Sequence, residues 1–385
     1  MLFADNRNKI GKYIPAVVFL IFIYGMALWF IFSPKPDYSS SEKRYLQKFP
    51  EVTAEKLLSG DFGSEFETFF ADRFPQRNTW VGLNAYTALA VGNNGASGVY
   101  NCKNGYLINK PVSTENNLDK NIGAVADFAK SIDTPTTVML VPSTGYIVDD
   151  VLPTFHDKYN DDEDISKISS TLSKDKIGFV DLRERFKSEY KNGSQLYYKT
   201  DHHWTTKGAY TGYQELCKTL GITPIDDSTL KKDSYPDFYG TTYSSSGFWL
   251  TPPDNIEIWN NPKNSDRNIS VKITEGANIK TSGSMYFTDH LKEDDKYPVF
   301  IDGNHALTEI TNTNAKNGTI LLIKDSFSHS LAPFLAENYS KVVLVDLRYY
   351  KESVSDLVTT YNPEQVVVLY GIDNLATDTD IVWLK

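Results

Sequence analysis

Residues 196–208 read LYYKTDHHWTTKG, a stretch that places one carboxylate and two imidazoles side by side. In an extended backbone, residues two positions apart point to the same side, so Asp201 and His203 can lie together while His202 points away. A carboxylate beside an imidazole is half of the relay that activates a serine hydroxyl for acyl transfer. The stretch therefore predicts that a nucleophile lies elsewhere in the chain.

The candidate nucleophile is Ser326, within residues 319–328, which read TILLIKDSFS. The apolar run is typical of a buried strand, and Ser326 follows it on a polar turn. Such a turn exposes the hydroxyl and lets the backbone N–H groups that follow it face a developing oxyanion. If the two stretches meet in space, Asp201 orients, His203 acts as the base and Ser326 attacks. The alternative is structural, since Asp201 and Ser326 could each simply cap a helix.

Metal binding is a second chemical interpretation of the same stretch. Asp and His side chains bind divalent ions, and a closed site needs about three or four ligands. His305 and His329 could complete such a site, but neither stands at a metal-ligand spacing. We therefore rank the metal site below the serine relay and expect neither a metal nor a cofactor.

The first 45 residues predict a membrane anchor. Residues 14–32 carry no charged side chain, and three basic residues precede them. At about 1.5 Å per residue this run nearly spans a hydrocarbon core of about 30 Å. The basic flank predicts a cytoplasmic tail (1–13), a transmembrane anchor (14–32), a tether (33–45) and an outward-facing domain (46–385). A cleaved signal peptide is the alternative, but the run is long for one and no small-x-small cleavage site follows it.

The body of the chain has the pattern of an α/β layer. A helix expected over residues 116–131 precedes a β-rich run at 136–141, and three further apolar runs follow residue 318. This order predicts a parallel sheet, in which ligands sit beyond the carboxyl ends of strands, so Ser143 becomes a candidate site residue. Residues 220–318, rich in Asn, Asp, Ser, Thr and Gly, predict an antiparallel β insertion packed beside that layer.

The composition limits which classes of partner and which cysteine states are possible. With 39 basic and 49 acidic side chains the net charge is −10, and no basic stripe is visible, so we expect no nucleic-acid partner. The two cysteines, Cys102 and Cys217, could form one long-range disulfide or remain two buried thiols.

Three short strings carry a resemblance to the bacterial DHHW family: DHHW at 201–204, KDSF at 324–327 and VDLRYY at 345–350. That family is similar to the SGNH-hydrolase-like O-acetyltransferases that modify alginate and other exopolysaccharides. The resemblance covers nearly all of the chain after the anchor. It implies an SGNH-hydrolase-like α/β domain in which Asp201, His203 and Ser326 are orienter, base and nucleophile.

The resemblance also points to loops after the later strands as oxyanion or substrate-binding candidates. These loops contain Arg348 and Tyr349 in one and Asn374 in the other. The order of Asp373 and Asn374 departs from the Gly-x-Asn-Asp order usual in SGNH enzymes, and Lys324 replaces the usual glycine of the serine block. Arg348 could instead form a salt bridge with Asp346.

For function, the resemblance implies a membrane-anchored enzyme outside the cell that moves acetyl groups onto a polysaccharide through an acyl-serine. It also implies a membrane-bound acyltransferase partner that supplies the acetyl groups. One alternative is a carbohydrate esterase that completes the second step with water. Another is a non-catalytic glycan-binding or assembly protein that keeps the fold with an idle relay.

Overall fold

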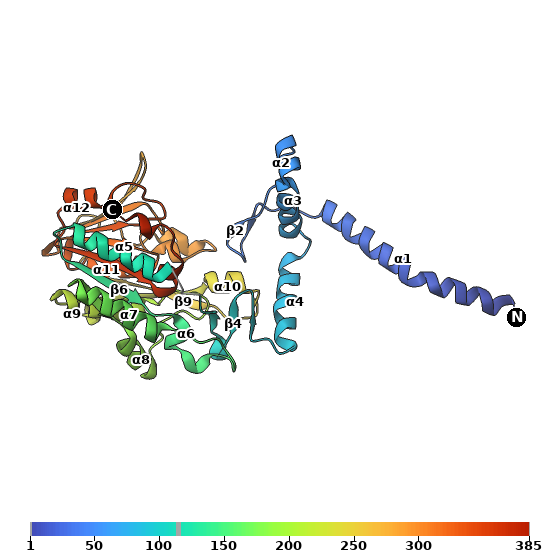
Figure 1. The fold of residues 1–385 in the computed structure, drawn as a ribbon, viewed down its shortest axis with the longest axis horizontal. Coiled ribbons are helices and arrows are strands. Elements are labelled where there is room, and N and C mark those ends of the chain that lie inside the picture. Colours follow the sequence, from blue (N-terminus) through green and yellow to red (C-terminus); the bar gives the residue numbers. More distant parts are fainter. Residues whose placement is uncertain (1, 113–116, 385) are drawn as a thin grey trace. The chain divides into compact units, whose positions relative to one another are not determined.

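The computed structural model describes residues 2–112 and 117–384. It divides into two compact units, Met1–Tyr86 and Thr87–Lys385, and Figure 1 labels many of their elements. The first unit contains helices and two very short strands: α1 (Leu2–Phe32), β1 (Tyr38–Ser39), β2 (Arg44–Tyr45), α2 (Ala54–Ser59), α3 (Asp61–Asp72) and α4 (Arg77–Ala90), the last continuing into the second unit.

Helix α1 contains a stretch that is long and apolar enough to cross a membrane. This stretch, Lys12–Phe32, has a mean hydropathy of 2.4, which agrees with the apolar helix predicted over 14–32. The backbone that follows it is fixed by Arg73, whose guanidinium donates hydrogen bonds to the carbonyls of Lys35 and Pro36, both at 2.7 Å, and of Gln47 at 3.0 Å. A buried guanidinium bonded to three carbonyls holds the segment after α1 against the end of α3.

The second unit is built on an eight-stranded sheet in the order β11-β10-β12-β14-β13-β15-β6-β7. Its strands are β6 (Thr136–Val141), β7 (Gly178–Asp181), β10 (Ile269–Glu275), β11 (Asn278–Ser282), β12 (Leu307–Asn312), β13 (Asn317–Lys324), β14 (Tyr339–Val345) and β15 (Gln365–Gly371). The five strands from β14 to β7 are parallel, whereas β12, β10 and β11 are antiparallel. The predicted mixed α/β architecture with a mostly parallel central sheet is confirmed.

The helices of this unit follow the expected alternation with strands. They are α5 (Asn117–Ser131), α6 (Thr144–Ile147), α7 (Asp161–Lys174), α8 (Arg183–Lys191), α9 (Thr206–Leu220), α10 (Thr241–Ser246), α11 (Ser328–Leu335), α12 (Val354–Tyr361) and α13 (Ile372–Thr377). The helix predicted over 116–131 is α5, and residue 116 lies outside the described residues. Small sheets complete the unit: β3 (Gly95–Ala96), β4 (Val99–Asn101) and β5 (Leu107–Asn109) form one, and β8 (Lys231–Phe238) pairs with β9 (Asp254–Asn260).

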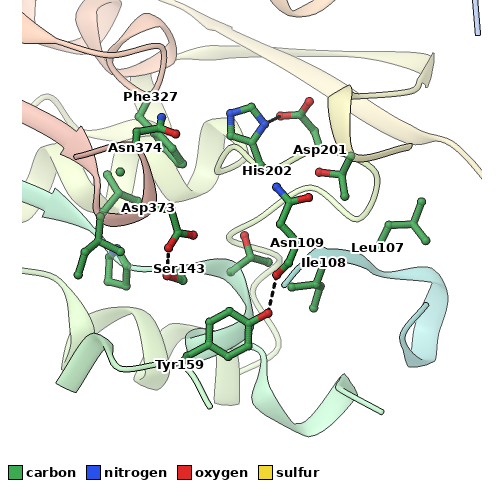
Figure 2. A pocket seen from close by; sticks show the side chains of 17 residues that line it. Leu107, Ile108, Asn109, Ser143, Tyr159, Asp201, His202, Phe327, Asp373 and Asn374 are labelled. Carbon is green, nitrogen blue, oxygen red and sulfur yellow. Dashed lines mark hydrogen bonds and ion pairs between the residues drawn. The ribbon is translucent and has the colours of Figure 1, made fainter. Parts of the chain in front are cut away.

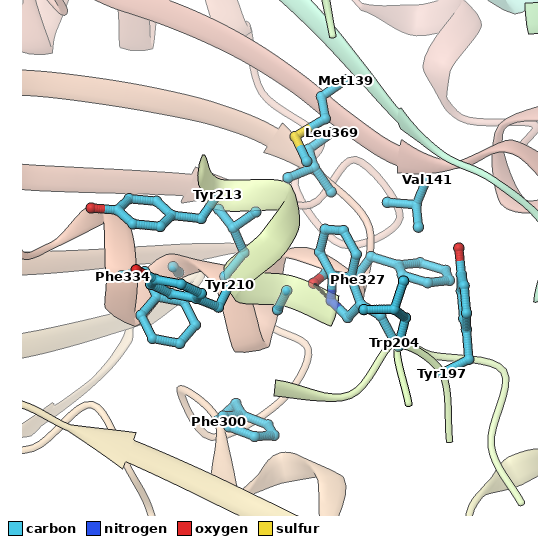
Figure 3. Close-up of a cluster of buried hydrophobic side chains, with 14 of the residues drawn as sticks. Met139, Val141, Tyr197, Trp204, Tyr210, Tyr213, Phe300, Phe327, Phe334 and Leu369 are labelled. Carbon is cyan, nitrogen blue, oxygen red and sulfur yellow. Dashed lines mark hydrogen bonds between the residues drawn. The ribbon is translucent and has the colours of Figure 1, made fainter. Parts of the chain in front are cut away.

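Side chains of the central strands alternate between two apolar clusters, one on each face of the sheet. In β13, Ile320 and Leu322 belong to the cluster that contains residues of α9 and α11, part of which Figure 3 shows. Leu321 and Ile323 belong to the cluster with residues of α5 and α12. Both faces are therefore covered, as the continuous apolar runs of the sequence require. Each buried Leu or Ile contributes about 1.5–3 kcal/mol to this packing.

The β insertion differs from the expectation in its placement. We expected residues 220–318 to pack beside the α/β layer, but β10, β11 and β12 continue the sheet itself, because β12 pairs with β14. This pairing satisfies backbone groups of β14 that an edge strand would leave open. Only β8 and β9 of the insertion form a separate pair.

Cys102 and Cys217 are both buried and free in the structure, and burial raises the pKa of each thiol to about 12. We therefore predict that a reducing agent leaves the unfolding temperature unchanged. Alkylation after denaturation without reductant should label both cysteines, as read by intact mass. An unlabelled product two hydrogens lighter would contradict this prediction.

Candidate active site

The two stretches that the sequence analysis singled out meet beyond the carboxyl end of β13. Residues 196–205 form a tight reversal, in which Tyr197 pairs with Trp204 and the N–H of Thr205 donates to Leu196. Helix α9 begins directly after this reversal, with Thr205 as its N-cap. Ser326 lies in the turn between β13 and α11. Neither the reversal nor the turn is regular structure, so both can aim side chains into one space.

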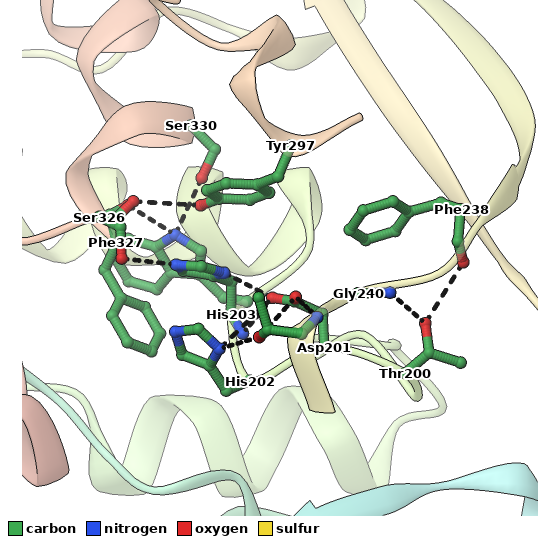
Figure 4. Close-up of polar contacts among 12 residues, drawn as sticks. Thr200, Asp201, His202, His203, Phe238, Gly240, Tyr297, Ser326, Phe327 and Ser330 are labelled. Carbon is green, nitrogen blue, oxygen red and sulfur yellow. Dashed lines mark hydrogen bonds and ion pairs between the residues drawn. The ribbon is translucent and has the colours of Figure 1, made fainter. Parts of the chain in front are cut away.

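Asp201, His203 and Ser326 form a continuous hydrogen-bonded relay (Figure 4). The Nδ1 atom of His203 lies 2.5 Å from Asp201 Oδ1, and its Nε2 atom lies 2.7 Å from Ser326 Oγ. Since an ionised carboxylate only accepts, Nδ1 carries the hydrogen and Nε2 is free to accept the Ser326 hydroxyl proton. All three residues are buried. This arrangement can raise the nucleophilicity of a serine.

Asp201 and His203 are brought together differently from our expectation. The backbone bends here, and the Asp201 carboxylate accepts the N–H of His203 at 2.9 Å, which is an Asx turn rather than an extended strand. His202 consequently does not point away, and its ring centroid lies 3.9 Å from that of His203. Burial and the neighbouring His203 lower the pKa of His202, so it stays neutral beside the relay.

The second oxygen of Asp201 is satisfied by the start of α10. Oδ2 accepts hydrogen bonds from the N–H of Thr241 at 2.7 Å and from its hydroxyl at 3.1 Å. Burial opposes the charge on Asp201, yet the imidazoles of His203 and His202 and these hydrogen bonds hold the pKa of this carboxyl well below its usual range. Asp201 is therefore a carboxylate at neutral pH.

Tyr297 and Trp204 hold the other two members of the relay in place. The Tyr297 ring stacks on His203, with centroids 4.0 Å apart and planes 11° apart, and its hydroxyl donates to the Ser326 carbonyl at 3.2 Å. Trp204 Nε1 donates to the Phe327 carbonyl and to Ser330 Oγ, both at 2.9 Å. Trp204 thus fixes the turn that carries Ser326. Sequence analysis did not assign a role to Thr241 or Tyr297, because their contacts with Asp201 and His203 join residues far apart in the chain.

The backbone N–H groups after Ser326 do not match our expectation of an oxyanion site. The N–H of Phe327 donates to the Asp325 carboxylate, and that of Ser328 donates to the Asp325 carbonyl. The turn is closed on itself, which engages both donors. The N–H of Ser326, in contrast, has no acceptor within the described part of the chain.

Asn374 lies beside this turn. One hydrogen of its amide goes to the buried Asp325 carboxylate at 2.7 Å, and the N–H of Gly371 donates to the same oxygen at 2.8 Å. The amide therefore keeps its second N–H hydrogen for another acceptor. A role for Asn374 in binding an oxyanion stays a prediction.

Arg348 forms the salt bridge that we considered as the alternative to substrate binding. Its Nε and Nη2 atoms contact the Asp346 carboxylate at 2.8 and 2.6 Å. Buried Lys324 donates to the same carboxylate at 2.8 Å and to His329 Nε2 at 2.9 Å. Tyr349 is half-exposed and lies under the Arg348 guanidinium, and across residues 2–112 and 117–384 no contact joins it to the relay.

Ser143 lies in the wall of a pocket that also contains Asp201 and His202 (Figure 2). Its N–H donates to Asp161 at 2.7 Å and its hydroxyl donates to Asp373 at 3.2 Å. The structure therefore places Ser143 near the relay but outside its hydrogen-bonded chain.

A metal ion would compete with the relay for the same atoms. Asp201, His202 and His203 offer one ligand atom each within 4.8 Å of one another. Both ring nitrogens of His203 are already hydrogen-bonded, however, so a metal would have to break the contact to Asp201 or to Ser326. Neither further candidate joins the group: His305 contacts Glu275 and Asp302, and His329 contacts Lys324.

A family model and three solved structures relate this chain to known proteins. A family model described as DHHW protein matches residues 109–345. A DHHW family protein from Eubacterium siraeum has a similar structure, with a TM-score of 0.63 and 17% identity over 75% of this chain and 97% of that one. Bacillus cereus PatB1 gives a TM-score of 0.61 and 21% identity over 73% and 98%. PatB1 with a sulfonyl adduct gives 0.60 and 20% over 74% and 97%. No curated protein matches significantly.

Gly240 permits the close approach of α10 to Asp201. A Cβ atom at this position would lie 2.1 Å from Asp201 Cβ and 2.2 Å from Oδ2. We predict that Gly240→Ala lowers the stability by about 1–3 kcal/mol and slows acylation of Ser326 by about a hundredfold, because the carboxylate moves. Denaturant unfolding measures the loss of stability. The rate at which an acylating reagent modifies Ser326 measures the effect on acylation.

Gly123→Ala in α5 is the matched control, since its Cβ would meet no atom within 4 Å. This variant should label at the normal rate and gain up to about 1 kcal/mol from helix propensity. Normal Ser326 labelling in Gly240→Ala would contradict the role assigned to this contact.

Proposed function

The chain belongs to the DHHW protein family, and on that premise we propose that it is an SGNH-hydrolase-like O-acyltransferase that moves acetyl groups onto a polysaccharide. The observation that carries the proposal is the relay itself, with 2.5 Å from Asp201 to His203 and 2.7 Å from His203 to Ser326. A buried serine within hydrogen-bond reach of an imidazole that a carboxylate orients is the arrangement that covalent acyl transfer requires.

In the first step, Ser326 Oγ attacks the carbonyl carbon of the acetyl donor while its proton passes to His203 Nε2. Asp201 stabilises the imidazolium that forms. His203 then returns this proton to the leaving group as the bond between acetyl and donor breaks. Ser326 is left as an acetyl ester, and His203 is neutral again.

In the second step, a sugar hydroxyl gives its proton to His203 Nε2 and attacks the acetyl carbon. The ester bond to Ser326 breaks, and Oγ regains the proton from His203. In both steps a negative charge develops on the acetyl oxygen. The N–H of Ser326 and the second amide hydrogen of Asn374 are the donors we assign to it, because neither has an acceptor within the described residues.

We assign α1 the role of an uncleaved anchor, with residues 1–13 in the cytoplasm, residues 33–45 as the tether and the body of the chain outside the cell. The span Lys12–Phe32 supports this assignment by its length and hydropathy. A domain on that side needs an acetyl donor delivered across the membrane, which a membrane-bound acyltransferase partner would supply. The polysaccharide is then the acceptor, and water in its place would give the esterase reaction.

The first experiment is intact-mass analysis of the full chain after exposure to an activated acetyl ester. We predict one acetyl adduct at Ser326, absent from Ser326→Ala and formed about a thousandfold to ten-thousandfold more slowly in Asp201→Asn. Because a solved neighbour carries a sulfonyl adduct, an aryl sulfonyl fluoride is the second reagent, and it should label the same residue.

Ser355→Ala, at a half-buried position of α12 outside the relay, is the matched control and should acylate normally. Adding candidate glycans to the acetylated protein separates the reactions, since transfer moves the acetyl group to the sugar and hydrolysis releases acetate. Absence of any adduct in a folded protein, with neither reagent labelling Ser326, would sink both catalytic interpretations and leave a non-catalytic glycan-binding role.

The relay also predicts how acylation responds to chelators. Because both His203 nitrogens are engaged by Asp201 and Ser326, Ser326 should acylate at the same rate after exhaustive treatment with EDTA. Added Zn²⁺ should slow acylation, because it would compete for the nitrogen that accepts the serine proton. Loss of acylation on chelation, restored by metal, would favour a metal-dependent mechanism.

A further inference from the structure

A narrow pocket adjoins the relay on the side of Asp201 and His202. Its wall is formed by the end of β5, the loop after β6 and the start of α13, and Figure 2 shows Asn109, Ser143 and Asp373 facing it. Phe327, the residue after Ser326, lines the pocket, and its ring centroid lies 5.1 Å from that of His203. The open volume is about 50 Å³, which holds about three or four water molecules. A small exocyclic group fits this space, whereas a sugar ring does not.

The polar atoms of this wall include both hydrogen-bond acceptors and hydrogen-bond donors. Ser143 spends its hydroxyl hydrogen on Asp373 Oδ1, and Tyr159 spends its own on the Asn109 carbonyl at 2.6 Å. Asp373 Oδ2 has no partner among residues 2–112 and 117–384, and neither has the side-chain amide of Asn109. A hydroxyl group can use both, because it can donate to the accessible carboxylate oxygen and accept from the Asn109 amide.

The pocket is also negatively charged. Asp201 and Asp373 line it, and its lining contains neither Lys nor Arg. Asp161 lies directly behind, bonded to the N–H of Ser143, but burial raises the pKa of its carboxyl to about 7, so it adds only part of a charge at neutral pH. Burial raises the pKa of Asp373 to about 6, which leaves this carboxyl mostly ionised at neutral pH. A carboxylate entering the pocket would face like charges without a neutralising cation.

We propose that this pocket receives the hydroxymethyl arm of an uncharged hexose in the acceptor polysaccharide, held by Asp373, and that it excludes the carboxylate of a uronic acid. The inference rests on the proposed function, because it assigns a substrate class to the same site. A sugar seated with its arm in the pocket places its ring beside Phe327 and brings a neighbouring hydroxyl toward Ser326. The pocket thus selects which sugar presents a hydroxyl to the acetylated serine.

The test compares matched sugar pairs that differ only at this arm. Methyl glycosides of glucose, galactose and mannose are each set against the corresponding uronic acid. Binding is measured by ligand-observed NMR on the full chain in detergent micelles. The chain carries the Ser326→Ala substitution, which prevents turnover. We expect at least one neutral sugar to bind about tenfold or more tightly than its uronate, with the strongest saturation transfer at the protons of its hydroxymethyl group.

Asp373→Asn should weaken neutral-sugar binding by about tenfold and reduce the preference over the uronate. Asp127→Asn is the control for net charge, since Asp127 is exposed on α5, and it should leave the ratio of affinities unchanged. A uronate that binds as tightly as its neutral partner would overturn the proposal. So would the absence of binding by all six sugars, or an unchanged ratio in Asp373→Asn.

Failure of this inference and failure of the proposed function give different results. Acetylation of Ser326 does not require the pocket, so an adduct without sugar preference rejects the pocket alone. A neutral-sugar preference without any adduct would keep the pocket as a binding site and reject the catalysis.

Discussion

The buried charge of Asp201 is the constraint on which the rest of the site depends. A carboxylate removed from water is costly unless its oxygens are hydrogen-bonded or paired. Here the compensation comes from the ring and N–H of His203 and from both donors of Thr241. The donors of Thr241 come from α10, within the β-rich insertion, and Gly240 admits them by lacking a Cβ. The insertion is therefore part of the relay's structure and not an addition to a finished domain.

The sequence predicted the parts of this site that depend on residues close together in the chain. The strands were predictable because β13, β14 and β15 are apolar on both faces. The grouping of Asp201 with His203 was predictable because the two residues lie within three positions of the chain. Contacts between distant residues were not predictable, such as Tyr297 stacking on His203 or Thr241 bonding Asp201. The orientation of His202 was also missed, because it depends on an Asx turn that overrides the strand-like alternation we assumed.

A second buried group of charges surrounds Lys324, one of the two departures from the SGNH sequence pattern noted above. Lys324 stands at the end of β13 where a glycine is usual, and it shares the Asp346 carboxylate with Arg348 from the next loop. Burial opposes ionisation of Asp346, but Arg348 and Lys324 hold the pKa of its carboxyl below the usual value. Such a pair contributes little net stability compared with apolar residues, yet removing one partner strands a buried charge. Arg348 is thus held, through the Asp346 carboxylate, at the ends of β13 and β14.

In this chain Asp201 and His203 precede Ser326, and Trp204 joins the two stretches that carry them. Asp201 and His203 sit in the reversal before α9, and Trp204 in the same reversal reaches the carbonyl after Ser326. One rigid, buried indole thus links both halves across the cluster of Figure 3. Because a relay is defined by the positions of its atoms, chain order carries no chemical consequence as long as this link holds. The tryptophan of the DHHW string therefore fixes the turn that carries Ser326, while the aspartate and the second histidine form the hydrogen-bonded chain that reaches the Ser326 hydroxyl.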